Sequence, residues 1–285
     1  MADLVAVAAS SHAPLIARDW AKLPPAHKER LTAAFRALGA RMAAARPDVI
    51  VVVSPDHWVN FFIDNLPSIC IGVGVEHEGP PEPFLKDFPW RPVAGHAALA
   101  NHIHATALAN EFEPSVSHRM ILDHGFCIPL MRMELDPLPR IVPFVVNTLE
   151  PPMPSVSRCL AWGKLLRAAI ASYPGNERVA VLATGGLSHS IGEPTMGAID
   201  ERFDRDCIAA FRAGAEGPLV EFLEAEMEGA GNGSHECRNW IVAHGAAGSR
   251  GFDLVDYVAI PEVYVGCGFA TWNVGAGAAR ETLPT

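Results

Sequence analysis

Residues 49–57 read VIVVVSPDH, and a second apolar run, LVAVAASSH, occupies residues 4–12. Apolar side chains at successive positions over the length of one strand are typical of strands buried on both faces of a parallel sheet. Both runs end in small or turn-forming residues, followed by a histidine. We therefore predict an α/β fold in which a mostly parallel central sheet is flanked by helices.

A helix is expected between these two strands. Residues 26–46 are rich in Ala, Leu and Arg at helical spacing, and Pro47 marks their end. A right-handed crossover between parallel strands brings their carboxyl ends to the same edge of the sheet. We expect His12 and His57 to lie close together at this C-terminal rim, where open α/β sheets bind ligands.

A third histidine follows a strand in the same way. Residues 179–184 form a buried-strand pattern that stops at Gly185 and Gly186, and glycine allows the sharp turn that leads to His189. His124 lies in another polar turn, DHG at residues 123–125. A neutral imidazole is a natural base for a phenolic hydroxyl, although each of these two residues could also be an ordinary loop histidine.

The rest of the chain continues the α/β pattern. Residues 76–92 contain five prolines and are expected to form an irregular lid or interface. We expect a single domain over residues 1–285 with a frayed tail at 274–285. Further strands are predicted at residues 60–64, 68–75 and 140–147, and further helices at 95–110, 156–173, 199–213, 219–228 and 235–245.

The composition excludes several classes of partner. With 22 basic and 32 acidic residues the net charge is −10, and no basic cluster is available for a phosphate backbone, so we expect no nucleic-acid partner. The six cysteines include no Cys-x-x-Cys pair, which favours reduced thiols. The chain shows neither the basic start of a signal peptide nor a membrane-spanning run. We expect a cytoplasmic protein with no membrane partner.

Two imidazoles at one rim suit a metal ion. Glu236, in the stretch GSHE at residues 233–236, is a candidate third ligand, although a glutamate near a helix start can simply favour the helix dipole. Two histidines and one carboxylate leave positions open for substrate and oxygen, as in non-haem Fe(II) oxygenases. The same set also suits Zn²⁺ with a bound water. The predicted ligands therefore suit either Fe(II) or Zn²⁺.

Common catalytic motifs are absent. Residues 235–239, HECRN, lack the second histidine of His-Glu-x-x-His, and residues 186–190, GLSHS, do not form Gly-x-Ser-x-Gly. A zincin protease and a serine hydrolase are therefore not expected.

Four motifs follow one another along the chain, which are SSHAP at 10–14, SPDH at 54–57 with FF at 61–62, DHGF at 123–126, and GGLSH at 185–189. In these motifs and in their order the chain resembles the class III, LigB-type, extradiol ring-cleavage dioxygenases, the group of the protocatechuate 4,5-dioxygenase β subunit and 2,3-dihydroxyphenylpropionate dioxygenase. The resemblance implies that His12, His57 and Glu236 hold Fe(II) and that O2 is a co-substrate. It implies that His189 is the catalytic acid/base and that His124 contacts the substrate.

The resemblance also implies a reaction, which is meta cleavage of a catechol-type aromatic with insertion of both atoms of O2. A carboxylated substrate of the protocatechuate or gallate kind would need a local cation, for which Arg91, Arg119, Arg132 and Arg238 are candidates. Some relatives require a small α subunit and others act as homo-oligomers, so either partner is possible. The alternatives are a zinc-dependent hydrolase and a non-catalytic scaffold on the same fold. The presence of all four motif histidines argues against the scaffold.

Overall fold

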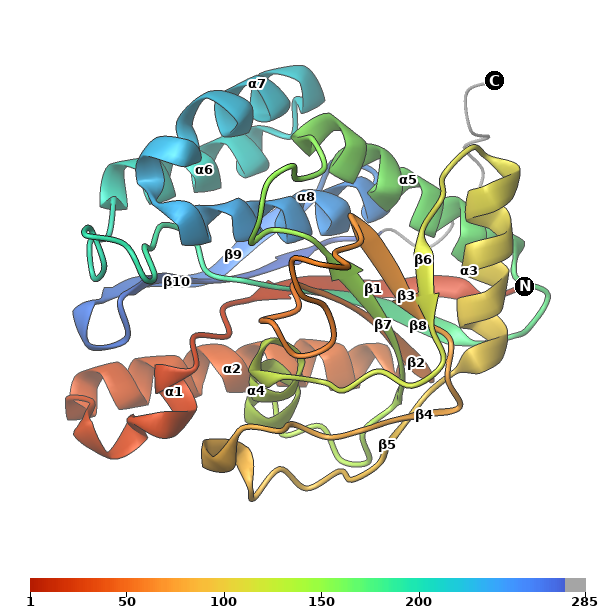
Figure 1. Cartoon of the computed structure of the whole chain (residues 1–285), viewed down its shortest axis with the longest axis horizontal. Helices are drawn as coiled ribbons and strands as arrows, with labels where there is room; N and C mark the ends of the chain where they lie inside the picture. Colours follow the sequence, from red (N-terminus) through yellow and green to blue (C-terminus); the bar gives the residue numbers. More distant parts are fainter. Residues whose placement is uncertain (275–285) are drawn as a thin grey trace.

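The structure, a computed structural model, describes residues 1–274. Its main sheet has eight strands in the order β6-β3-β7-β2-β8-β1-β10-β9 (Figure 1). These strands are β1 (Asp3–Ser10), β2 (Val49–Ser54), β3 (Ile69–Gly72), β6 (Ser115–Ser117), β7 (Arg140–Val146), β8 (Arg178–Thr184), β9 (Phe252–Ile260) and β10 (Val265–Trp272).

The centre of this sheet is parallel. The neighbours β7, β2, β8 and β1 all run in the same direction, while β10 and β9 continue the sheet in antiparallel pairing beyond β1. On the other side, β3 pairs antiparallel with β7 and parallel with β6. The prediction of an α/β fold with a mostly parallel central sheet is confirmed.

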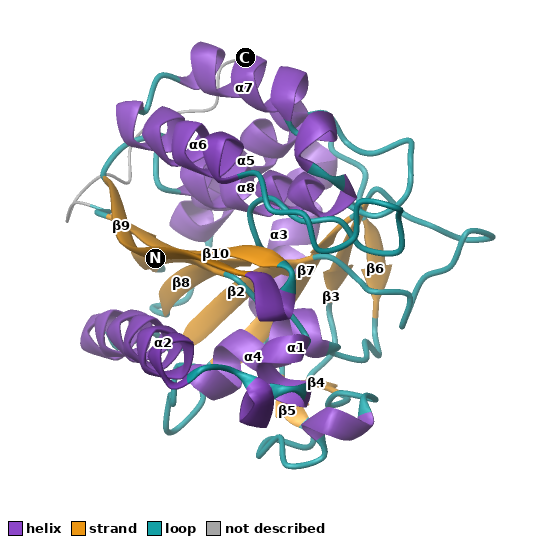
Figure 2. Cartoon of the chain, turned by 90° about the vertical axis from the view of Figure 1, so that its left-hand side faces the viewer, coloured by secondary structure: helices purple, strands orange, loops and turns teal. Residues whose placement is uncertain are grey.

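Helices cover both faces of the sheet, as Figure 2 shows edge-on. The lower layer of that view consists of α1 (Leu15–Arg18), α2 (Pro25–Ala45) and α4 (His124–Arg132). The upper layer consists of α3 (Ala97–Ala109), α5 (Val156–Ser172), α6 (Glu201–Ala213), α7 (Glu216–Glu226) and α8 (Cys237–Ala246). Each layer packs on its own apolar cluster, and the sheet separates the two clusters.

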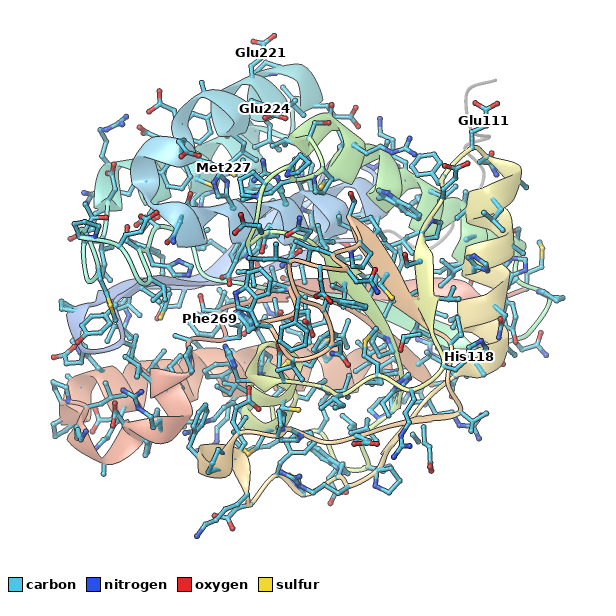
Figure 3. All side chains as sticks on the ribbon, viewed as in Figure 1. Glu111, His118, Glu221, Glu224, Met227 and Phe269 are labelled. Atoms are coloured by element: carbon cyan, nitrogen blue, oxygen red, sulfur yellow. The ribbon has the colours of Figure 1, made fainter. Side chains whose placement is uncertain are left out.

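Aromatic side chains anchor both layers to the sheet. Phe269 of β10 lies between the sheet and α2, where its ring meets Phe35 edge-on at 4.9 Å between centroids (Figure 3). On the other face Trp240 of α8 is fully buried, and its Nε1–H donates to the carbonyl of Gly185 at 3.1 Å. Burying a large apolar side chain stabilises the fold by about 1.5–3 kcal/mol. Trp240 therefore fixes α8 against the turn that follows β8.

One predicted strand was wrong, and one hairpin was not predicted. Residues 60–64 form a loop with a single bridge between Phe62 and Asn65, because the buried carboxylate of Asp56 accepts the backbone N–H groups of Val59, Asn60 and Phe61. These groups therefore need no strand partner. The antiparallel hairpin of β9 and β10 was not predicted. Apart from Val274, the tail expected to fray lies outside the described residues.

The proline-rich segment 76–92 is largely irregular, as predicted. It contains only the short strand β4 (Glu76–His77), which pairs with β5 (Val93–Ala94), and the 3-10 helix η2 (Pro83–Leu85). No helix within residues 1–274 is both long enough and apolar enough to cross a membrane.

Candidate active site

Three of the predicted histidines lie at one rim of the sheet. Strand β8 lies between β2 and β1, and all three are parallel, so their carboxyl ends meet at this rim. His12 follows β1, His57 follows β2 and His189 follows β8. The rings of His12 and His57 are 4.9 Å apart between centroids.

Glu236 reaches the same point from the 3-10 helix η4 (Asn232–Glu236). Its Oε1 lies 3.0 Å from Nε2 of His12 and 3.6 Å from Nε2 of His57. Its Oε2 accepts the backbone N–H of Gly186 at 2.6 Å. Gly185 has a φ of +147°, and a Cβ there would lie 2.7 Å from Cβ of Glu236, so the glycine turn makes room for the carboxylate.

The orientation of His57 is set by Asp123, a fully buried residue. One carboxylate oxygen of Asp123 lies 3.0 Å from Nδ1 of His57 and 2.7 Å from its backbone nitrogen. An ionised carboxylate only accepts hydrogen bonds, so Nδ1 carries a proton and Nε2 is the ring nitrogen directed toward Glu236. Partial burial opposes the charged ring, but the charges of Asp123 and Glu236 outweigh it and raise the pKa of His57 to about 10. The site therefore favours a positive charge at this point.

His12 is held in a similar way. It is buried, and its Nδ1 lies 3.1 Å from Oγ1 of Thr184, the last residue of β8. Histidines that bind metals generally have a hydrogen-bond partner on their other ring nitrogen. Both His12 and His57 have such a partner, and both direct Nε2 to the same carboxylate oxygen.

His124 begins α4 and stacks on His57, with 4.0 Å between the ring centroids. Its Nδ1 lies 2.8 Å from Oε1 of Glu82, which also accepts the backbone N–H of His124 at 2.9 Å. Burial and the neighbouring charge of His57 lower the pKa of His124. Ring nitrogens of His12, His57 and His124 lie within 4.8 Å of one another. His124 is therefore a second candidate for the third ligand position, besides Glu236.

His189 is also buried. Its Nδ1 lies 2.9 Å from the carbonyl oxygen of Leu187, which only accepts, so Nδ1 carries the proton and Nε2 is left with its lone pair. That Nε2 is 3.7 Å from Oε2 of Glu236. Burial lowers the pKa of His189 and so favours the neutral ring. A neutral imidazole is the form that a general base requires.

The turn that carries His189 is clamped from α6. The buried carboxylate of Asp204 accepts the backbone N–H of Ser188 at 2.7 Å and its hydroxyl at 2.9 Å. It also accepts the hydroxyl of Tyr257 at 2.6 Å. Burial, the largest influence, raises the pKa of Asp204 to about 6 although these hydrogen bonds favour its charged form.

A cavity of about 560 Å³ opens onto these groups. His12, His57, His124, His189 and Glu236 all line it. Much of the remaining wall is apolar and includes Ala13, Pro14, Leu15, Leu149, Val263 and Val265. A concave apolar site with a few converging polar groups is the usual form of a small-molecule site.

None of the four arginines proposed for a substrate carboxylate lines this cavity. Arg91 and Arg132 donate to backbone carbonyls, Arg238 donates to the carbonyl of Pro154, and Arg119 pairs with Glu78. The cavity is instead lined by Arg18, six positions after His12. Sequence reasoning also missed Glu82, Asp123, Asp204 and Tyr257 as partners of the site.

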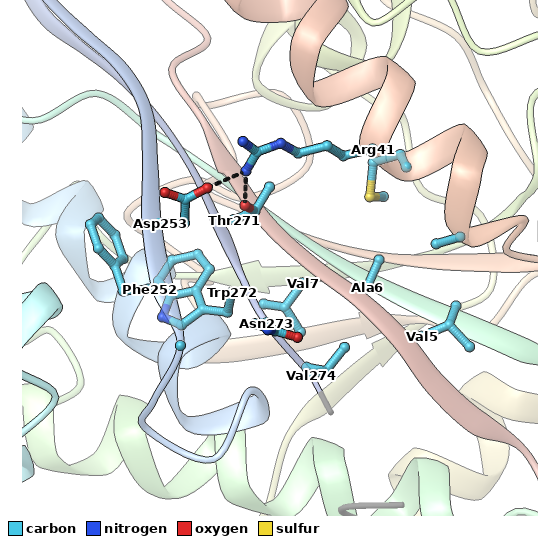
Figure 4. Close-up of a pocket in the computed structure, with 13 residues that line it drawn as sticks. Val5, Ala6, Val7, Arg41, Phe252, Asp253, Thr271, Trp272, Asn273 and Val274 are labelled. Carbon is cyan, nitrogen blue, oxygen red and sulfur yellow. Dashed lines mark hydrogen bonds and ion pairs between the residues drawn. The ribbon is translucent and has the colours of Figure 1, made fainter. Parts of the chain in front are cut away.

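A second cavity, of about 540 Å³, lies beside the first half of β1 (Figure 4). Its wall contains no histidine, cysteine or glutamate. Its arginine, Arg41, donates to Asp253 and Thr271, so this guanidinium is already paired with residues of the same wall. The histidine-lined cavity is therefore the candidate active site.

Comparison with known proteins identifies the family of the chain. The family described as the catalytic LigB subunit of aromatic ring-opening dioxygenase matches residues 6–269. The chain belongs to this family, whose named members include class III extradiol-type dioxygenases.

Two relatives show the range of the family. A 2,3-dihydroxyphenylpropionate/2,3-dihydroxicinnamic acid 1,2-dioxygenase of Burkholderia vietnamiensis is 31% identical, over 90% of this chain and 94% of the relative. A gallate dioxygenase of Pseudomonas putida is 41% identical over 170 residues, which are 56% of this chain and 47% of the relative. A solved structure of an uncharacterized protein from Escherichia coli has a TM-score of 0.59 at 17% identity, over 85% of this chain and 92% of that chain, and supports the fold alone.

Proposed function

We propose that this protein is an Fe(II)-dependent extradiol dioxygenase that opens the ring of a catechol-type aromatic and inserts both atoms of O2. The observation that carries the proposal is the convergence of His12 Nε2 and His57 Nε2 on Oε1 of Glu236, at 3.0 and 3.6 Å. Family membership supports ring opening by a dioxygenase. A substrate that bears a carboxylate is part of the proposal.

The donor set fits a non-haem iron. His12, His57 and Glu236 would hold the ion through two imidazole nitrogens and one carboxylate oxygen, and both imidazoles have an outer partner that fixes the ring. Such a set leaves positions open for substrate and oxygen, and the chemistry that Fe(II) supplies when bound is the activation of O2 beside the diol.

His189 would act as base and then as acid. His189 lines the cavity, and its Nε2 lies 3.7 Å from Oε2 of Glu236. Its neutral ring can accept the proton of a catechol hydroxyl. The bond from Nδ1 to the carbonyl of Leu187 stabilises the resulting imidazolium and keeps its orientation. The same Nε2–H can then return the proton as the ring opens.

His124 would hold a substrate oxygen. Its Nδ1–H is taken by Glu82, so Nε2 is the nitrogen that can accept a substrate hydroxyl or, once protonated, donate to a substrate oxygen. The stacking of His124 on His57 would place this contact beside the metal ligands. The apolar walls of the cavity would favour the binding of an aromatic ring.

Anaerobic loading with Fe(II) followed by oxygen uptake tests the proposal. The chain alone is assayed with catechols, gallates and aminophenols, and absorbance of a yellow ring-fission product is recorded with the oxygen trace. We expect coloured product and oxygen consumption in equal amounts. Specific binding of Zn²⁺, with hydrolysis and no oxygen uptake, would instead favour the zinc-dependent hydrolase, and failure to retain any metal would favour the scaffold.

A further inference from the structure

The cavity wall carries one arginine and no lysine among the described residues that line it. This residue, Arg18, ends the short helix α1, which starts three positions after His12. Helix α1 packs against the 3-10 helix η5 (Pro261–Val263), and the residue after η5, Tyr264, lines the same cavity. Arg18 and Tyr264 therefore come from two elements that are in contact.

Part of the guanidinium is free. Nε and Nη2 of Arg18 donate to one oxygen of Asp19, at 3.1 and 2.8 Å. Its Nη1 has no hydrogen-bond partner within residues 1–274, and neither has the hydroxyl of Tyr264. Asp19 occupies the Nε side of the guanidinium, so the edge formed by Nη1 and the second hydrogen of Nη2 can receive another carboxylate. The Arg18 side chain is 57% exposed, so a ligand can reach it.

The surrounding charge makes this arginine significant. The chain has a net charge of −10, and the cavity wall contains the carboxylates of Glu236 and Glu150. Glu236 is matched by the imidazoles of His12 and His57, so Glu150 is the carboxylate of the wall that an anionic substituent would meet, and a cation nearby would offset it. Arginine suits this task because its planar donors match the two oxygens of a carboxylate.

We propose that Arg18, assisted by the hydroxyl of Tyr264, binds the side-chain carboxylate of the substrate and so selects carboxylated catechols over unsubstituted ones. This inference rests on the proposed function of the same cavity. Arg18 acts on the substituent and not on the reacting ring. The substitution of this residue therefore changes the choice of substrate and leaves the ring-opening step itself intact.

The test compares Arg18→Gln, Arg18→Lys and Tyr264→Phe with the wild-type protein. The substrates are catechol, 3,4-dihydroxybenzoate and 3-(2,3-dihydroxyphenyl)propionate. For the preferred carboxylated substrate we expect Arg18→Gln to lower kcat/KM by about 10–100-fold, mainly through KM, as for the loss of a hydrogen bond to a charged group. Catechol should react within about twofold of wild type, and Tyr264→Phe should cause a smaller loss of the same kind.

The matched control is Arg36→Gln. Arg36 is an exposed arginine of α2 that pairs with Glu134 and does not line the cavity, so its loss removes one positive charge without touching the proposed site. Arg36→Gln should leave unchanged the ratio of kcat/KM for the preferred carboxylated substrate to kcat/KM for catechol. An Arg18→Gln protein that loses activity equally on catechol and on the acids, or that keeps its wild-type preference, would overturn the inference.

Equilibrium binding separates this inference from the proposed function. Calorimetry of metal-loaded protein with 3,4-dihydroxybenzoate and with catechol, in the absence of oxygen, reports selectivity without any turnover. A wild-type preference for the acid that disappears in Arg18→Gln supports the carboxylate site even if no ring cleavage is found. A wild-type protein that binds both ligands equally well contradicts the inference, whether or not it cleaves catechols.

Discussion

Nε2 of His12 lies 3.0 Å from Oε1 of Glu236, although 224 positions separate the two residues in the chain. His12 follows the first strand, and Glu236 ends the 3-10 helix before α8, which packs on α5, β8 and β1. Burying a carboxylate such as that of Glu236 costs free energy unless the group is paired and hydrogen-bonded. The contact supports our proposal that Glu236 is the third ligand of the metal.

The first prediction concerns this ligand. Glu236→Ala should lower bound iron well below one per chain, because only two imidazoles remain. The comparison variant is His124→Ala, which should keep iron if His124 acts on the substrate. Metal analysis after anaerobic loading and desalting measures both. Full occupancy in Glu236→Ala together with loss of iron in His124→Ala would transfer the ligand role to His124.

The second prediction concerns the acid/base. His189→Ala should keep iron at the wild-type level while kcat falls by about 10²–10⁴-fold, the usual contribution of a general acid or base. Iron analysis and steady-state oxygen uptake on the same preparation give both numbers. A kcat close to that of wild type would remove His189 from the proton transfers.

Asp123→Asn tests the support of His57. The amide cannot match the charge that Asp123 places on the Nδ1 side of this ring, so iron affinity should fall by about 10–100-fold, as for other outer partners of metal-binding histidines. Competition with a chelator gives the affinity. The control is Asp19→Asn, which alters a more exposed carboxylate outside the metal site. An unchanged affinity in Asp123→Asn would show that the orientation of His57 does not depend on this carboxylate.

Asp204 predicts a pH dependence of stability. Its pKa is about 6 in the folded protein against an ordinary value of 3.8, so between these values the folded state binds a proton that the unfolded chain has lost. Stability therefore falls as pH rises through this window, by up to about 1.4 kcal/mol per unit of pKa shift. Asp204→Asn, which keeps an acceptor for Ser188, should gain stability relative to wild type from pH 4 to pH 7. Urea unfolding at a series of pH values measures this, and a constant difference would contradict it.

The positions of His12, His57 and His189 could be predicted because strand ends leave a direct mark in the sequence. Each follows an apolar run, and parallel strands bring such ends to one rim. Glu236 was suggested only weakly by its own surroundings and more strongly by the family resemblance. It lies on a short 3-10 helix whose place over the rim depends on the packing of α8 through Trp240.

The remaining partners could not be predicted, because they depend on contacts between loops. Glu82 comes from the proline-rich segment, and nothing in that segment indicates a bond to His124. Arg18 was overlooked because its place at the cavity depends on the packing of α1, which contacts η2 and η5. Strand β9 was missed because Asp253 and Asp256 interrupt its apolar pattern. Both pair with arginines of α2, Arg41 and Arg30, at the exposed edge of the sheet.

The most direct test of the account is the fate of O2. The Fe(II)-loaded protein is allowed to turn over a carboxylated catechol under isotopically labelled O2, with immediate quenching, and the ring-fission product is analysed by mass spectrometry. We predict that the opened product carries two labelled oxygen atoms and that His189→Ala forms almost none of it. A product without label, or no product from iron-loaded protein with any catechol, gallate or aminophenol, would contradict extradiol cleavage.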